Sequence, residues 1–170
     1  IEDLKLFSHL ISLHTYVPTD DLSFLKDFIN LEELYICNSN NSNWTFLENI
    51  LSLKFLYIEN ANFSDLTPIS ILCKRQQDVI EKMRRENKDI VLCKYLRNLA
   101  IIRCGIDDIS PLANCELIVE LNLSHNSLSD LGPIRKMKWL YFLTLRYNNI
   151  TDITPLKDKK GLYMINLRHN

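Results

Sequence analysis

The sequence predicts an α/β fold in which short repeats coil into a right-handed solenoid. A curved parallel β-sheet would line the concave face, with short 3₁₀ or helical turns on the convex side and one helical insertion. Three observations support this prediction: apolar residues recur every 22 residues, a proline stands at one place in most copies, and one non-repeating stretch has helical spacing. The 170 residues suit one repeat array and are few for a two-domain enzyme.

The repeat is clearest in the second half of the chain. Three adjacent copies start 22 residues apart: LRNLAIIRCGIDDISPL from Leu96, IVELNLSHNSLSDLGPI from Ile118 and LYFLTLRYNNITDITPL from Leu140. A further copy, LYMINLRHN, starts at Leu162. Two upstream segments fit the same template, LKFLYIENANFSDLTPI closely and LEELYICNSNNSNWTFL more loosely.

Each part of the repeat predicts its own local structure. Apolar residues fall at repeat positions 1, 4, 6, 11, 14, 17 and 20, and the alternation around positions 4 and 6 is typical of a strand with one buried face. Proline at position 16, as at Pro133 and Pro155, pushes the residue before it toward extended geometry, so a long regular helix cannot begin earlier, and the return path is expected to be a short 3₁₀ or single-turn helix. Asparagine at position 9, as at Asn126 and Asn148, is expected to bond to backbone groups of its own turn and of the neighbouring turn.

These residues resemble a leucine-rich repeat array. The tails DDISPL, SDLGPI and TDITPL look like those of the 22-residue repeats of bacterial internalins. The resemblance implies protein recognition on the concave sheet and no catalytic machinery. One unit cannot bury its apolar edge alone, so stacked copies are expected to share a continuous core.

One domain, 1–170, is expected to contain four stretches: 1–30, an irregular N-terminal repeat or cap; 31–69, two repeats; 70–89, a helical insertion; and 90–170, regular repeats truncated at the C-terminus. In the first stretch Ile11 and Leu13 alternate inward as a strand would. The loop to Leu25 does not keep the template, so the register of this stretch remains open.

The insertion predicts a helix over Ile71–Asn87. It contains no Gly or Pro, and Leu72, Val79 and Met83 recur at helical spacing. In one interpretation the apolar stripe packs on the convex side and the basic residues form a solvated face; in the other, the protruding basic helix is a second surface for a partner. These basic residues are Lys82, Arg84, Arg85 and Lys88.

Composition argues against several function classes. The three glycines lie far apart, so neither a phosphate-binding loop nor a dinucleotide-binding turn is predicted. A net charge of −1 gives no sign of nucleic-acid binding, and no apolar run approaches the roughly 20 residues that span a membrane. His125 and His169 share one repeat position two copies apart, too far for one metal ion. No enzyme activity, cofactor or metal is therefore expected, and the recurring aspartates are interpreted as turn residues: Asp65, Asp108, Asp130 and Asp152.

The five cysteines leave the cellular compartment open between cytoplasm and bacterial cell surface. Cys93, Cys104 and Cys115 are interpreted as small buried hydrophobes at core or turn positions. A disulfide between Cys73 and Cys93, which flank the insertion, is the alternative for an exported protein. Cys37 is expected to face outward from its strand and to be the most reactive thiol.

The candidate site is the concave face, formed by side chains at positions 3, 5, 7 and 8. One end of this face is aromatic and acidic, and the other is aromatic and basic. Tyr, Phe and Arg commonly anchor protein interfaces. The expected protein-binding residues are Tyr35, Phe55, Tyr57, Arg103, Phe142, Arg146, Tyr147 and Arg168.

Two functions remain open at this point. The first is a non-catalytic, monomeric domain that recognises a protein or a peptide on its concave sheet. The second is a spacer, sensing or targeting module of a larger enzyme or effector whose active part lies outside these residues. Neither function involves a nucleic-acid partner or membrane insertion of this segment.

Overall fold

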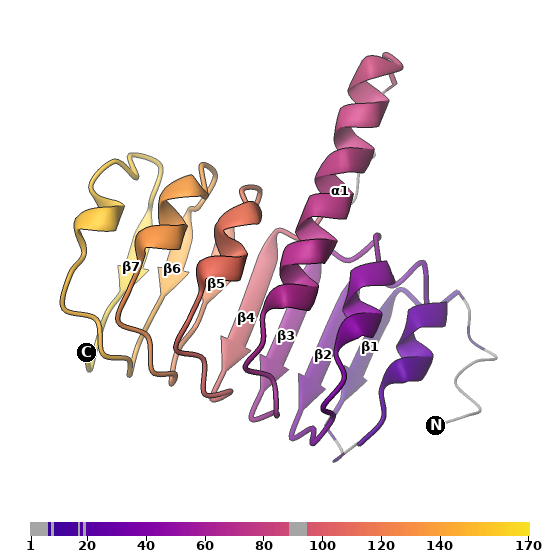
Figure 1. Ribbon diagram of the computed structural model, residues 1–170, viewed down its shortest axis with the longest axis horizontal. Helices are drawn as coiled ribbons and strands as arrows, with labels where there is room; N and C mark the ends of the chain where they lie inside the picture. Colours follow the sequence, from indigo (N-terminus) through magenta and orange to yellow (C-terminus); the bar gives the residue numbers. More distant parts are fainter. Residues whose placement is uncertain (1–6, 8, 17, 19, 89–94) are drawn as a thin grey trace.

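Seven parallel strands form one open sheet in the computed structural model (Figure 1). The structure describes residues 7, 9–16, 18, 20–88 and 95–170. The strands follow one another across the sheet in chain order: β1 (Ser12–Thr15), β2 (Glu33–Cys37), β3 (Phe55–Glu59), β4 (Asn98–Ile102), β5 (Glu120–Asn122), β6 (Phe142–Thr144) and β7 (Met164–Asn166). The predicted solenoid is confirmed.

The chain returns from each strand to the next on the other side of the sheet, mostly through short 3₁₀ helices. These are η2 (Ser23–Asp27), η3 (Thr45–Asn49), η5 (Ser110–Asn114), η6 (Gly132–Lys136) and η7 (Thr154–Leu156). A proline stands in the first turn of the last three. Proline is tolerated there because the first N–H groups of a helix have no partner within it.

The first strand defines the register that the sequence left open. Ser12 pairs with Glu33, so the first copy starts at Leu10, 21 residues before Leu31 and one residue short of the period. Leu10 and Leu13 consequently pack against the core, whereas Ile11 is 58% exposed. The expectation that Ile11 points inward was wrong.

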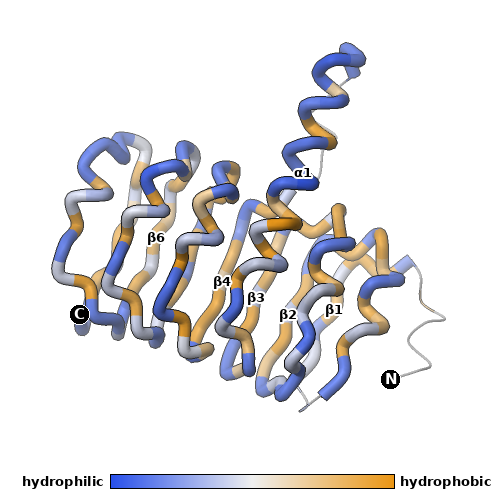
Figure 2. Tube along the Cα trace, in the orientation of Figure 1, coloured by the Kyte–Doolittle hydropathy of each residue, from blue (hydrophilic) through white to orange (hydrophobic). Residues whose placement is uncertain are grey.

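Stacked leucine and isoleucine side chains form one continuous core between the sheet and the turns. Equivalent positions lie side by side: Leu56 of β3 is paired with Leu34 on one side and with Leu99 on the other. All three are at most 1% exposed. Figure 2 shows hydrophobic residues along the strands and polar residues at the tip of the long helix.

An asparagine ladder satisfies the backbone of the turns that follow the strands. Asn148, 6% exposed, accepts a hydrogen bond from the Leu128 N–H at 3.0 Å and donates to the carbonyls of Leu123 and Leu145 at 2.9 and 3.1 Å. The same pattern occurs at Asn126 and Asn170. Each amide thus joins two turns, as the sequence predicts.

The recurring aspartates have the expected role in turns. In each of four repeats the Oδ1 atom accepts a hydrogen bond of 2.7 or 2.8 Å from the backbone N–H two residues later: Asp65 from Thr67, Asp108 from Ser110, Asp130 from Gly132 and Asp152 from Thr154. Hydrogen bonds from the backbone N–H and then the hydroxyl of Ser110 lower the pKa of Asp108.

The insertion forms a helix, α1 (Thr67–Arg85), which starts four residues before the predicted Ile71 and ends two before Asn87. Pro68 lies in its first turn, where no N–H is required, so the proline is compatible with this earlier start. The helix replaces the 3₁₀ turn of its repeat and packs between η3 and η5 (Figure 1).

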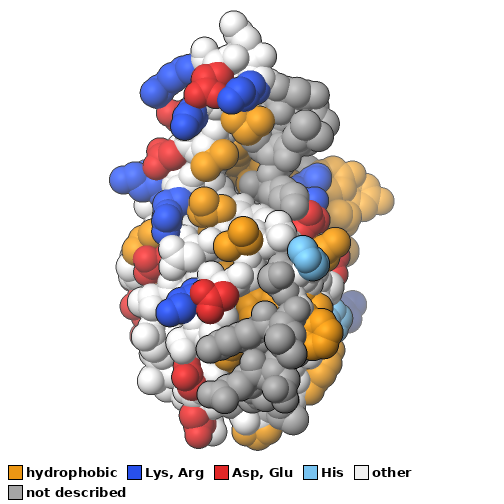
Figure 3. Space-filling view, turned by 90° about the vertical axis from the view of Figure 1, so that its right-hand side faces the viewer, with side chains coloured by type: hydrophobic (Ala, Val, Ile, Leu, Met, Phe, Trp, Pro, Cys, Tyr) orange, Lys and Arg blue, Asp and Glu red, His pale blue; other side chains and the backbone are white. Residues whose placement is uncertain are grey.

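The first part of α1 packs against the solenoid. Gln76, 2% exposed, donates to the carbonyls of Leu51 and Leu53 at 3.1 and 2.9 Å and accepts from the Leu96 N–H at 2.8 Å. The last turns project beyond the sheet, and charged side chains gather there (Figure 3). The predicted basic residues on this projecting end are exposed: Lys82, Arg84, Arg85 and Lys88.

A disulfide joins α1 to the next repeat. It links Cys73 to Cys115, which follows η5; their Cα atoms are 5.2 Å apart, and both residues are buried. The interpretation of Cys115 as a free buried hydrophobe was wrong, because α1 packs across η5 and places Cys73 beside it. Cys73 is therefore not available to Cys93, which lies outside the described residues.

Candidate functional site

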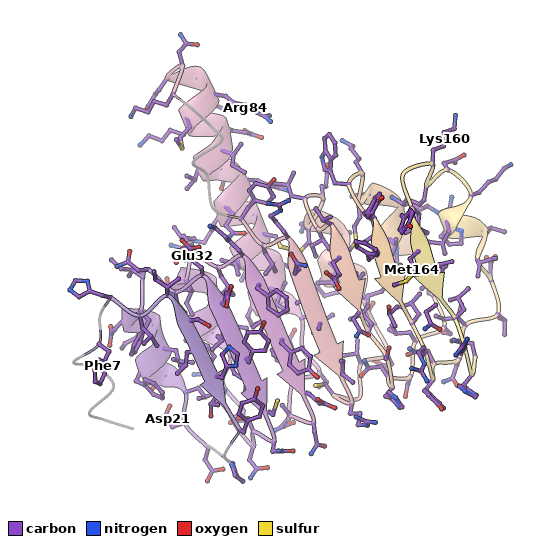
Figure 4. All side chains as sticks on the ribbon, turned by 180° about the vertical axis from the view of Figure 1, so that it is seen from behind. Phe7, Asp21, Glu32, Arg84, Lys160 and Met164 are labelled. Carbon is purple, nitrogen blue, oxygen red and sulfur yellow. A yellow bond between two sulfur atoms is a disulfide. The ribbon has the colours of Figure 1, made fainter. Side chains whose placement is uncertain are left out.

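The concave face of the sheet carries the side chains at repeat positions 3, 5, 7 and 8, and Figure 4 looks onto this face. All the residues predicted there are half-buried or exposed: Tyr35, Phe55, Tyr57, Arg103, Phe142, Arg146, Tyr147 and Arg168. Seven of them fall into two groups, one on β2 and β3 and the other on β6 and in the turns after β6 and β7, and Arg103 follows β4 between these groups.

An aromatic cluster occupies the first strands. The Tyr35 ring centroid lies 3.9 Å from that of His14, 4.9 Å from that of Phe55 and 5.7 Å from that of Tyr57. The Tyr57 hydroxyl donates a hydrogen bond of 2.6 Å to Glu59 Oε2. Burial and then this hydrogen bond raise the pKa of Tyr57, so the phenol stays protonated and fixed. His14 was not among the predicted site residues, because the register of its strand was open.

A second stack of rings follows β5, β6 and β7. The Tyr147 ring lies between those of His125 and His169, at centroid distances of 4.3 Å on both sides and interplanar angles of 16° and 12°. The guanidinium carbon of Arg146 lies 5.5 Å from the centroid of the Tyr147 ring. The prediction included Tyr147 and omitted both histidines, although their recurrence at position 8 was visible in the sequence.

An ion pair lies between the two groups. Arg103 Nη1, in the turn after β4, is 2.6 Å from Glu59 Oε1 of β3. Glu59 therefore accepts from both Tyr57 and Arg103. Because the Arg103 side chain is 52% exposed, this pair adds little to stability and mainly fixes the positions of the two side chains.

The two free cysteines of the described chain are both buried. Cys37 is 7% exposed, since the longer Glu59 side chain is its lateral partner on β3, and burial followed by the charge of Glu59 raises its pKa. Burial raises the pKa of Cys104 to about 11. Cys37 thus occupies a concave-face position, as expected, but it is buried there, and the expectation of an exposed, reactive thiol was wrong.

Labelling of Cys37 by a thiol reagent is accordingly expected to be slow in the folded protein. At about pH 8 an exposed cysteine reacts readily as its thiolate, whereas a buried thiol with a raised pKa does not. Peptide mapping after a short exposure to iodoacetamide should find Cys37 labelled only after unfolding. An Asn40→Cys variant supplies an exposed control in the next turn; labelling of Cys37 as fast as of this control would contradict the expectation.

No metal centre is found among the described residues, since no group of three His, Cys, Asp or Glu side chains there could hold an ion. Within the same part of the chain, no helix is both long and apolar enough to cross a membrane.

Comparison with known proteins supports the repeat assignment. Residues 118–170 match the family model for leucine-rich repeats, in two copies. No curated protein sequence matches the chain. Among solved structures, internalin C2 from Listeria monocytogenes is similar, with a TM-score of 0.63 and 21% identity over 98% of this chain and 75% of that one.

Two other structures have the same fold. A leucine-rich repeat protein of Leptospira interrogans matches with a TM-score of 0.72 and 16% identity over 98% of this chain. The leucine-rich repeat ectodomain of the plant membrane receptor kinase GASSHO1/SCHENGEN3 from Arabidopsis thaliana, solved in complex with CASPARIAN STRIP INTEGRITY FACTOR 2, has a TM-score of 0.65 and 17% identity over 94% of this chain. The chain spans only 39% and 18% of these two proteins. Identities this low show the fold alone.

Proposed function

We propose, from the premise that this chain is a leucine-rich repeat solenoid with internalin-like repeats, that it is a non-catalytic, monomeric domain that binds a protein or peptide on its concave face. Leucine-rich repeat domains commonly mediate protein–protein interaction. The plant receptor ectodomain, which holds another factor in its structure, supports ligand binding by such a solenoid.

The observation that carries this proposal is the aromatic cluster on the face opposite the turns. Tyr35, Phe55 and Tyr57 stack across adjacent strands, all three are half-buried, and no helix or strand of the described residues covers them on that side. A sheet face that only meets solvent could use Thr, Lys or Ser at these positions. Large aromatic side chains with little freedom are the residues that contribute most to protein interfaces.

A photo-crosslinking experiment can locate the partner-binding surface. Benzoylphenylalanine placed at Thr144 on the concave face should crosslink a protein from extracts of the source organism, whereas the same group at the convex, exposed Lys136 should not. Crosslinking from Lys136 alone would contradict the proposal and favour a role in which the sheet is a spacer.

With the crosslinked partner in hand, the double variant Tyr57→Ala/Phe142→Ala should bind it about 30-fold more weakly, a loss of about 2 kcal/mol. The unfolding midpoint should change little because both side chains are partly exposed. The matched control is Trp139→Ala/Tyr163→Ala, which removes two aromatic side chains that are 66% and 73% exposed outside the concave strand positions. Equal affinity of both double variants for the partner would argue against the concave face.

A further inference from the structure

The charge on the concave face is divided between its two ends. Glu33 and Glu59 lie on β2 and β3, whereas the last four repeats carry one concave carboxylate, Glu120, which accepts a hydrogen bond from Asn98 at 2.6 Å. At the concave positions of the same four repeats the basic side chains are Arg103, His125, Arg146, Arg168 and His169. Because Arg103 is paired with Glu59, the uncompensated charge is at the C-terminal end.

Arg146 and Arg168 are neighbours without counterions. The Tyr147 N–H donates to the Arg168 carbonyl at 3.0 Å, so the two arginines occupy equivalent places, each two residues after its strand, in neighbouring copies about 4.8 Å apart. Among the described residues neither side chain forms an ion pair, and the buried Arg146 Nε has no hydrogen-bond acceptor. Like charges at paired strand positions destabilise a sheet, so stability alone does not account for this pair.

The rings beside the arginines occupy a backbone conformation that suits asparagine better. Position 8 is left-handed in each copy from β2 to β7: φ is 57° at Asn38, 51° at Asn60, 54° at Arg103, 58° at His125, 56° at Tyr147 and 62° at His169. Asparagine adopts this conformation readily, whereas arginine and tyrosine do so at a cost of about 1 kcal/mol or more. The last four copies nevertheless hold Arg, His, Tyr and His there, and the rings of the last three stack on one another.

His125 lies in the positive field of this surface. Desolvation, followed by the charges of Arg103 and Arg146, lowers the pKa of His125, although Glu59 acts in the opposite direction. An anion bound here would relieve the repulsion that the side chains now exert on one another.

We propose that the basic ledge, defined as His125, Arg146, Tyr147, Arg168 and His169, binds an acidic segment of a partner protein. Carboxylates of that segment pair with the two guanidinium groups, which accept planar, bidentate contacts, and the rest of the segment lies on the stacked rings. This inference rests on the proposed function and adds the chemistry of the ligand. A peptide is favoured over a nucleic acid because the acidic end of the same face repels a longer polyanion.

Fluorescein-labelled polyglutamate is the probe for this site, and binding is followed by fluorescence anisotropy at low salt. The wild-type chain should bind it, and binding should weaken as salt is added. Arg146→Gln/Arg168→Gln should weaken binding by about tenfold or more. The control, Arg84→Gln/Arg85→Gln, removes the same charge from the exposed end of α1 and should leave the affinity unchanged. Circular dichroism and thermal melting establish that both variants are folded.

Three results would overturn the inference: no binding of polyglutamate by the wild-type chain, an equal loss in both double variants, or tighter binding of a labelled oligothymidylate than of polyglutamate. The partner crosslinked at Thr144 separates this inference from the proposed function. If that partner loses affinity for Tyr57→Ala/Phe142→Ala but not for Arg146→Gln/Arg168→Gln, the acidic-segment inference fails and concave-face binding stands.

Discussion

Replacing both Cys73 and Cys115 by alanine is expected to lower the free energy of unfolding by about 4 kcal/mol. The bridge joins residues 42 positions apart. A cross-link over a loop of that length lowers the conformational entropy of the unfolded chain, which stabilises the folded state by about 4 kcal/mol. The measurement is chemical denaturation of the oxidised wild-type protein and of the double variant. Reductant should destabilise the wild-type protein to a similar extent and leave the variant unchanged.

The control for this prediction is Cys37→Ala, which removes a buried thiol that is not bridged. Its effect should be about 1 kcal/mol, the range expected for deleting one small core group. A non-reducing digest should yield one peptide pair containing Cys73 and Cys115. Linkage of Cys73 to any other cysteine, or unfolding that does not respond to reductant, would refute the prediction.

Substitution of Asn148 by alanine should cost about 3 kcal/mol of unfolding free energy. It removes the acceptor of the Leu128 N–H and the donor to the carbonyls of Leu123 and Leu145, all in a turn that excludes water. Each buried backbone group left without a partner costs about 1 kcal/mol or more.

The next residue provides a close control for this substitution. Asn149 is exposed, and Asn149→Ala should change the free energy of unfolding by less than about 0.5 kcal/mol. Urea denaturation of the two variants in parallel measures the difference. Similar values for both would show that the amide ladder is not what holds the turns together.

The features that the sequence predicted well are those that repeat. A period of 22 residues places Leu34, Leu56 and Leu99 in adjacent strands regardless of what lies between them. Asparagine at position 9 and aspartate at position 13 act on backbone groups a few residues away, so their partners follow from spacing. Local rules and one periodicity are therefore enough to predict the sheet and its turns.

The features that the sequence predicted poorly depend on contacts between segments. Cys73 is bridged to Cys115 because α1 packs against η5. Spacing along the chain does not predict how a helix packs against a neighbouring turn. His14 lies beside Tyr35 because the two residues are paired between β1 and β2. The sequence could not predict this pairing, since the irregular loop after β1 left the register of that strand open. The burial of Cys37 followed from the size of a side chain on the neighbouring strand.

The insertion also affects the cooperativity of the array. Most paired residues in neighbouring strands are 21 or 22 positions apart, but Phe55 of β3 and its partner Asn98 of β4 are 43 apart. Doubling the length of the connection between two strands raises the entropic cost of closing it by about 0.6 kcal/mol. The boundary between β3 and β4 is therefore the costliest one to form. Gln76 and the Cys73–Cys115 bridge both cross it, tying the repeat of β3 to the repeat of β4. In a structure whose units contact only their neighbours, these two links couple β1–β3 to β4–β7 so that both blocks unfold together.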